Sequence, residues 1–200
     1  MKRWICTTLA LASLFAIAAA AFAGDDKKAA MPAMDPAAEQ AMMAAMMPGE
    51  HHEHIKKLVG NFNYTIKLWM DPSGPADEST GTRTAEMVMG GRYLEEKYTG
   101  TFMGMAFEGK GTLGYDNMGK QYVSTWIDNM STGLLVAHGT CGDTGWDMSG
   151  ESMDPTTGKM VTTRSHTSMP DKDTIVMEMF MPGPDGKEFK MMEITCKRAM

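Results

Sequence analysis

Residues 92–115, RYLEEKYTGTFMGMAFEGKGTLGY, decide the fold class because polar and apolar side chains alternate along them. In the first half, Leu94, Glu96 and Tyr98 fall on one face of an extended chain, and in the second half Phe107 and Leu113 do. Successive side chains of a β-strand point to opposite faces, so this pattern predicts strands at 92–103 and 105–115. A hairpin-length connection between them makes the pair antiparallel.

The same texture of Thr, Tyr, Val and aromatic residues continues on both sides of this hairpin. Clusters of Gly, Pro, Asn and Asp separate the segments and mark turns. The further predicted strands are 61–70, 80–89, 120–128, 132–141, 144–153, 159–168, 173–181 and 187–197. About ten strands without crossover helices indicate an all-β antiparallel meander, and closing it removes the exposed edges. We therefore expect an up-and-down β-barrel with room for a cavity.

The N-terminus carries the pattern of a secretory signal peptide. Lys2 and Arg3 precede an apolar run over residues 4–20, and Ala21-Phe22-Ala23 is a small-x-small cleavage signal. The sequence predicts a signal peptide over residues 1–23, cleaved after Ala23. The alternative is a membrane anchor, for which the run is short. We expect a periplasmic or secreted protein with no membrane span after cleavage.

A linker and a short helix precede the predicted barrel. Residues 24–49 are rich in Ala, Met and Pro and lack β-branched and aromatic residues, which predicts a disordered linker with transient helix over 37–47. A short helix is expected over 50–58, where Gly60 follows its last apolar positions. The barrel domain is therefore placed at residues 50–200.

Composition limits the function classes. The chain has 200 residues, of which 43% are hydrophobic and 22% charged, and a net charge of −6. These values fit one globular domain with extra sequence, and they exclude a collagen, a long coiled coil and a mainly disordered chain. The acidic balance argues against nucleic-acid binding. The sequence has no nucleophile elbow, His-Glu-x-x-His run or Cys-x-x-Cys pair, so we expect no catalytic role.

Several blocks carry a family resemblance. They are Gly49-Glu50-His51-His52, Leu58-Val59-Gly60-Asn61-Phe62, Gly90-Gly91-Arg92-Tyr93-Leu94-Glu95-Glu96, Phe107-Glu108-Gly109, Gly114-Tyr115-Asp116, Tyr122-Val123-Ser124-Thr125-Trp126-Ile127-Asp128 and Gly186-Lys187-Glu188-Phe189. In this order the blocks resemble the bacterial domain-of-unknown-function family 1579 over nearly all of residues 50–198. The resemblance implies a calycin-like barrel, similar in outline to lipocalins and fatty-acid-binding proteins, and it brings no accepted catalytic or binding residues. The chain departs from the family at Phe62, where tryptophan is usual, and at Cys196, where tyrosine is common.

Strand faces that combine aromatic and charged residues are expected to point into the barrel, where an unpaired charge is costly. The candidate cavity residues are Arg92, Glu96, Tyr98, Trp126, Asp128, His138, Arg164, His166 and Glu178. A polar and aromatic interior suits a small hydrophobic or amphiphilic ligand, whose carboxylate Arg92 or Arg164 would bind. The alternative is a structural ion-pair network in which Glu96, Asp128 and Glu178 already occupy the arginines.

Two cofactor hypotheses remain beside the expectation of no cofactor. His138 or His166 would ligate haem iron if either faced the cavity, as in the nitrobindin-type barrels that the fold resembles. Thioether and imidazole groups select Cu(I), and they are frequent before the barrel. The candidate copper ligands are Met42, Met43, Met46, Met47, His51 and His54. The alternative for these methionines, among 24 in the chain, is a disordered leader without an ordered site.

Cys141 and Cys196 remain once residues 1–23 are removed. An oxidising compartment permits a disulfide between them, and the alternative is two separate thiols. The two cysteines end the sixth and tenth predicted strands, which are not neighbours in a sequential meander. We therefore expect no preformed disulfide.

Overall fold

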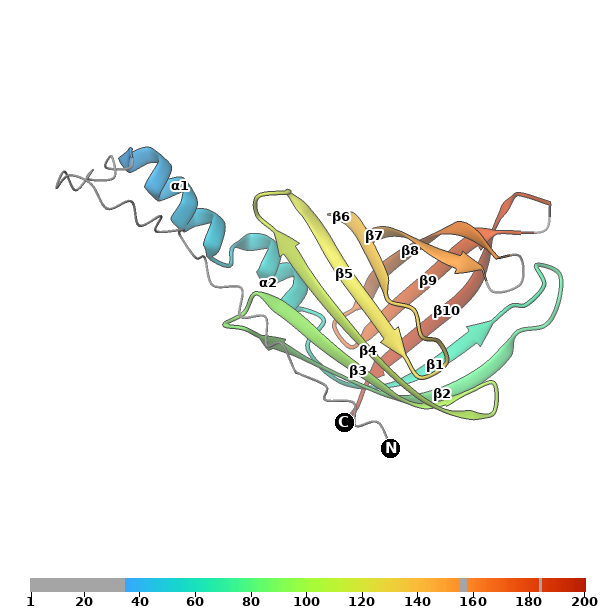
Figure 1. Cartoon of the computed structure of the whole chain (residues 1–200). Helices are drawn as coiled ribbons and strands as arrows, with labels where there is room; N and C mark the ends of the chain where they lie inside the picture. Colours follow the sequence, from blue (N-terminus) through green and yellow to red (C-terminus); the bar gives the residue numbers. More distant parts are fainter. Residues whose placement is uncertain (1–34, 155–157, 184) are drawn as a thin grey trace, which may run out of the picture. The chain divides into compact units, whose positions relative to one another are not determined.

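The structure is a computed structural model that describes residues 35–154, 158–183 and 185–200. Two helices precede ten strands along the chain (Figure 1). The helices are α1 Pro36–Met46 and α2 Glu50–Lys56, and the strands are β1 Gly60–Leu68, β2 Asp77–Val88, β3 Tyr93–Phe102, β4 Met105–Asp116, β5 Gln121–Asp128, β6 Leu135–Gly142, β7 Gly145–Asp154, β8 Lys159–Asp171, β9 Thr174–Pro182 and β10 Glu188–Arg198.

The strands form a closed antiparallel barrel in sequential order. Each strand pairs with its neighbours in the chain, and β1 pairs with β10 to close the sheet, for example Tyr64 opposite Cys196. The predicted ten-stranded up-and-down barrel is confirmed, and strand bounds differ from the prediction by a few residues. Among these, β6 starts at Leu135 because residues 129–134 form a loop.

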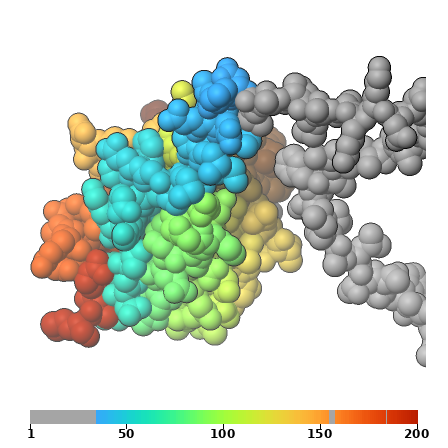
Figure 2. All heavy atoms as spheres, turned by 90° about the vertical axis from the view of Figure 1, so that its left-hand side faces the viewer, coloured from blue at the N-terminus to red at the C-terminus, as the bar shows by residue number. Residues whose placement is uncertain are grey.

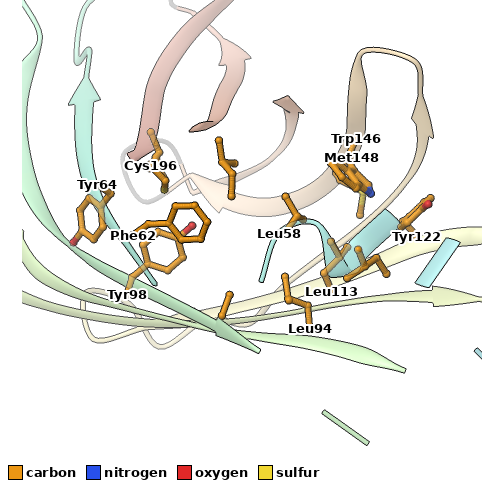
Figure 3. Packing of buried hydrophobic residues seen from close by; sticks show 14 of the residues in the cluster. Leu58, Phe62, Tyr64, Leu94, Tyr98, Leu113, Tyr122, Trp146, Met148 and Cys196 are labelled. Atoms are coloured by element: carbon orange, nitrogen blue, oxygen red, sulfur yellow. The ribbon is translucent and has the colours of Figure 1, made fainter. Parts of the chain in front are cut away.

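Alternation along the strands separates the interior from the outer surface. In β1, Phe62, Tyr64, Ile66 and Leu68 are buried while the residues between them are exposed or half-buried. Figure 3 shows such residues from several strands packed together, with Leu58 among them. The core is thus built from one face of a single closed sheet, as the period of two requires.

Helix α2 covers one end of the barrel. Ile55 and Leu58, at and just beyond its last turn, have exposed fractions of 0% and 4%. Its first turn begins after Gly49, whose amide donates to Nδ1 of His52 at 3.0 Å. The odd-numbered strands run away from this end and the even-numbered strands return to it, so α2 and the β3–β4 turn lie at opposite ends in Figure 1. In Figure 2 the cyan atoms of α2 lie over this end.

Part of the predicted linker is ordered. Residues 36–46 form α1, in agreement with the helical tendency predicted over 37–47. No residue of α1 is buried. Its last carbonyls accept hydrogen bonds from two turns of the barrel: Nη2 of Arg92 donates to Met46 O at 2.8 Å, and Nδ2 of Asn117 donates to Ala45 O and Met47 O at 3.0 and 2.8 Å. These donors satisfy carbonyls that a helix C-terminus leaves free.

The predicted signal peptide, residues 1–23, lies outside the described residues, as does the linker up to residue 34. Within the described part of the chain, neither helix has the length and apolar character needed to cross a membrane.

The two cysteines are separate thiols, in agreement with the expectation that no disulfide forms. Cys141 is half-buried on β6 and Cys196 is buried on β10, with three strands between them. We expect the intact mass of the mature protein to be the same with and without reductant. Brief native alkylation should label Cys141 before Cys196, which is 2% exposed. A mass lower by two hydrogens before reduction, or faster labelling of Cys196, would contradict this arrangement.

Candidate functional site

The barrel encloses a cavity of about 340 Å³. Apolar side chains supply most of its wall, and the methionines among them come from β7, β9, β10 and the loop between β5 and β6. The apolar and aromatic lining is Leu58, Ile66, Tyr98, Phe102, Phe107, Leu113, Trp126, Met130, Leu135, Ala137, Trp146, Met148, Ile175, Met177, Met179, Met192 and Ile194. Its volume is at the lower end of the range usual for small-molecule sites, about 300–1,000 Å³.

The cavity is closed at the α2 end and opens toward the other. Inward residues near α2 are sealed: Leu94 is 0% exposed and Trp146 is 5% exposed. Inward residues at the far ends of β3, β4 and β5, namely Phe102, Phe107 and Asp128, are only half-buried. Burial therefore decreases along the barrel from α2 to the β3–β4 turn.

A buried ion pair lies at the base of the cavity. Nε of Arg83 donates to Oε2 of Glu96 at 2.7 Å, and the exposed fractions of the two side chains are 2% and 16%. Nη1 of Arg83 donates to Leu58 O at 3.0 Å, and its guanidinium lies 5.1 Å from the ring centroid of Phe62. Burial alone would lower the pKa of Arg83, but the Glu96 carboxylate outweighs it and the pKa is raised. Arg83 therefore stays charged and paired.

Two other titratable groups beside this pair stay neutral. Burial, followed by the nearby Glu96 carboxylate, raises the pKa of Tyr98 well above its usual value. Burial also raises the pKa of the Cys196 thiol to about 11. Cys196 is thus a packed thiol with little thiolate at neutral pH, which does not suit a nucleophile.

Trp126 forms the aromatic wall of the cavity. Its Nε1 donates to Oδ2 of Asp128 at 2.8 Å, and its ring meets that of Tyr98 edge-on with centroids 5.3 Å apart. The indole lies over Gly109 and Gly111 of β4, where a Cβ at Gly109 would overlap the ring. The ring reaches this position only because two neighbouring inward positions lack side chains.

Comparison with known proteins gives the family. A family model described as "Protein of unknown function (DUF1579)" matches residues 47–198. The chain belongs to the DUF1579 family. Comparison with curated proteins finds no match. Among solved structures, a redesigned β-barrel is similar over 72% of this chain and 94% of its own, with 14% sequence identity and a TM-score of 0.39.

In this DUF1579 barrel, four predicted cavity residues line the cavity. They are Glu96, Tyr98, Trp126 and Asp128, from β3 and β5. The alternation of side chains in residues 92–103 and 120–128 explains why these four positions were predicted. The same inward faces hold Leu94, Phe102 and Tyr122.

The other five predicted cavity residues lie elsewhere, so those predictions are wrong. On β8, Ser165 and Thr167 line the cavity, which turns Arg164 and His166 outward. There Arg164 pairs with Glu188 at 2.9 Å and His166 with Asp147 at 2.8 Å. The second pair joins opposite positions of β7 and β8, whereas Arg164 reaches across β9 to Glu188 on β10.

The remaining three predicted cavity residues, His138, Glu178 and Arg92, also lie outside the cavity. On β6 Ala137 faces inward, so His138 is exposed on the outer face. On β9 Met177 and Met179 face inward, and Glu178 pairs outside with Lys190 at 2.9 Å. Arg92 precedes β3 and binds α1. Among the described residues no histidine lines the cavity, so neither His138 nor His166 is placed to ligate a haem there.

The candidate copper ligands lie on α1, on α2 and in the connection between them. Met42, Met43, Met46 and Met47 are 47–58% exposed. Sδ of Met47 is 3.9 Å from Nη2 of Arg92, whose positive charge opposes a cation there. Nδ1 of His51 is 3.0 Å from Tyr122 OH, and its ring stacks on Tyr115, while the His54 ring lies 6.2 Å away. Among the described residues, no group of three His, Cys, Asp or Glu side chains could hold a metal ion.

The sequence analysis missed Arg83, the most informative residue of the site. The signal was present: within the predicted strand 80–89, Arg83 shares a face with Gly81, Ala85 and Met87. That face contains no other charge, so a period-of-two analysis of this strand would have marked Arg83 as inward.

Replacing Arg83 tests this placement. Arg83→Met leaves the Glu96 carboxylate inside the barrel without its partner, so we expect the free energy of unfolding to fall by about 3–5 kcal/mol. Arg164→Met is the matched control, because its ion pair is 41% and 49% exposed and should cost less than about 1 kcal/mol. Urea unfolding measures both, and equal losses would show that the two arginines have similar surroundings.

Proposed function

We propose that this DUF1579 protein binds one small hydrophobic or amphiphilic molecule inside the barrel and that the molecule enters at the end opposite α2. The observation that carries the proposal is a cavity of about 340 Å³ with a mainly apolar lining, whose inward residues near α2 are buried. Burial of apolar ligand surface supplies affinity in such a site, and the few polar groups orient the ligand.

The composition of the wall supports a binding role with broad shape tolerance. Met148, Met177, Met179 and Met192 line the cavity from β7, β9 and β10. Methionine side chains are flexible and polarisable, so they adapt to ligands of different outline. The thiol of Cys196, whose pKa is raised to about 11, offers little nucleophile. These features favour binding over catalysis.

Filling the cavity tests the proposal. Ser165 lines it between Met148 and Met179, so a phenylalanine there would occupy the space of a ligand. We expect the parent protein to bind the uncharged probe N-phenyl-1-naphthylamine at one site with increased fluorescence. Ser165→Phe should weaken this binding at least tenfold.

Ser149→Phe is the matched control, because Ser149 lies exposed on the outer face of the neighbouring strand β7. It should bind the probe as the parent does. Absence of binding by the parent, or equal binding by Ser165→Phe and the parent, would overturn the proposal.

Export is part of the proposed function, and it is supported by the signal-peptide pattern of residues 1–23. We expect the protein recovered from the periplasm or medium of a bacterial host to begin at Gly24. N-terminal sequencing measures this directly. An uncleaved chain in the cytoplasm would contradict it.

A further inference from the structure

We infer that the cavity selects ligands whose head group donates a hydrogen bond and carries no negative charge, such as an alcohol or an ammonium. This inference rests on the proposed binding function. It concerns the polar groups that a ligand would meet inside the cavity, and it replaces the expectation that an arginine would bind a carboxylate.

The only cation of the lining is already engaged. Arg83 uses Nε for Glu96 and Nη1 for Leu58 O, and aromatic rings lie near its guanidinium. Arg92 and Arg164 lie outside the cavity. Among the described lining residues, no arginine or lysine is left to bind a carboxylate.

The lining is electronegative as a whole. Its titratable groups are Arg83, Glu96, Asp128, Tyr98 and Cys196, and the raised pKa values keep Tyr98 and Cys196 neutral. Two carboxyl groups, those of Glu96 and Asp128, therefore line the cavity with a single guanidinium. A carboxylate placed here would lose its hydration and meet like charge.

One acceptor of this lining is available to a ligand. Oε2 of Glu96 accepts from Arg83 and, at 3.5 Å, from Tyr98 OH, whereas no donor among the described residues reaches Oε1. Oε1 is not among the buried unpartnered atoms, so it keeps accessible surface. A Cβ at Gly111 would lie 3.3 Å from it and 3.2 Å from the Trp126 ring. The missing side chain at Gly111 thus leaves space beside Oε1.

Both carboxylate oxygens of Asp128 already accept hydrogen bonds. Oδ2 accepts from Trp126 Nε1, and Oδ1 accepts from the amides of Met130 and Ser131 at 2.9 and 3.0 Å. Asp128 therefore fixes the indole and the following loop, and it adds negative charge without offering a comparable free oxygen. Glu96 Oε1 is the atom to which a donor head group would bind.

Three ligands of equal chain length test the head-group preference: 1-decanol, decylammonium and decanoate, each displacing N-phenyl-1-naphthylamine at pH 7.5. We expect decanol and decylammonium to bind at least tenfold more tightly than decanoate. Equal affinities in a protein that binds the probe would overturn this inference and leave the proposed function standing. A parent protein that does not bind the probe would overturn both.

Any apolar cavity disfavours a carboxylate to some extent, so a variant must separate that general cost from the role of Glu96. Glu96→Gln removes the negative partner of Arg83 and frees a guanidinium for the ligand. We expect this variant to prefer decanoate over decanol, which reverses the order of affinities. Glu95→Gln is the matched control, because Glu95 is exposed on the outer face of the same strand, and it should keep the parent order. An unchanged order in folded Glu96→Gln would overturn the inference.

Gly111→Ala keeps both charges and provides the test if Glu96→Gln fails to fold. The added methyl group would stand between Oε1 and the ligand. We expect at least threefold weaker binding of decanol with unchanged binding of decanoate. Equal weakening of both ligands would assign the effect to lost volume and overturn the role of Oε1.

Discussion

The Arg83 guanidinium is the group on which the arrangement of the barrel interior depends. A buried charge needs a partner and satisfied donors, and Arg83 finds them in Glu96 on β3 and in the carbonyl of Leu58 just after α2. It therefore ties the covering helix to the wall of the sheet. Arg198 does the same from β10, since its Nη1 donates to Val59 O and its guanidinium lies 4.6 Å from the Phe62 ring. Arg83 and Arg198 thus donate to the carbonyls of two consecutive residues, Leu58 and Val59, in the connection between α2 and β1.

The ion pairs of the outer surface differ from the buried pair in their exposure to solvent. Cross-strand ion pairs of this surface, such as Lys97 with Glu108 and Lys67 with Glu78, are exposed and cost little to break. Each still favours one register of its strand pair, because opposite charges placed across a ladder are preferred to like charges. The Arg164 guanidinium also lies 4.3 Å from the Phe180 ring, which covers an aromatic residue that faces solvent. Aromatic and charged residues on one strand face therefore occur outside as well as inside.

This difference explains how far the sequence predicts the structure. Alternation and turn residues predict ten strands and their order, and the closed sheet follows from the exposed edges that an open meander would leave. Alternation gives two faces for each strand but not which one is inside. On β3 the apolar content of one face decides, and on β5 the aromatic residues Tyr122 and Trp126 mark the inward face. On β8 the inward face carries Ser165 and Thr167, and the outward face carries Arg164 and His166. The inward face of β8 is determined only by its pairing with β7 and β9, whose inward residues are Met148 and Met179.

The closed end of the barrel has a consequence for any molecule held at Glu96. Because α2 closes one end of the barrel, a ligand bound as proposed would enter and leave through the opposite end. Its head group would pass Phe102 and Phe107 before it reaches Glu96. The head group would lose its hydration water before it forms a hydrogen bond to Glu96. Ligand entry and release would therefore have a higher barrier than the equilibrium affinity suggests. The tail follows and ends at the opening, where a longer chain simply extends into water. On the proposed mode of binding, the barrel would discriminate between ligands by the chemistry of one terminus and would tolerate different lengths at the other.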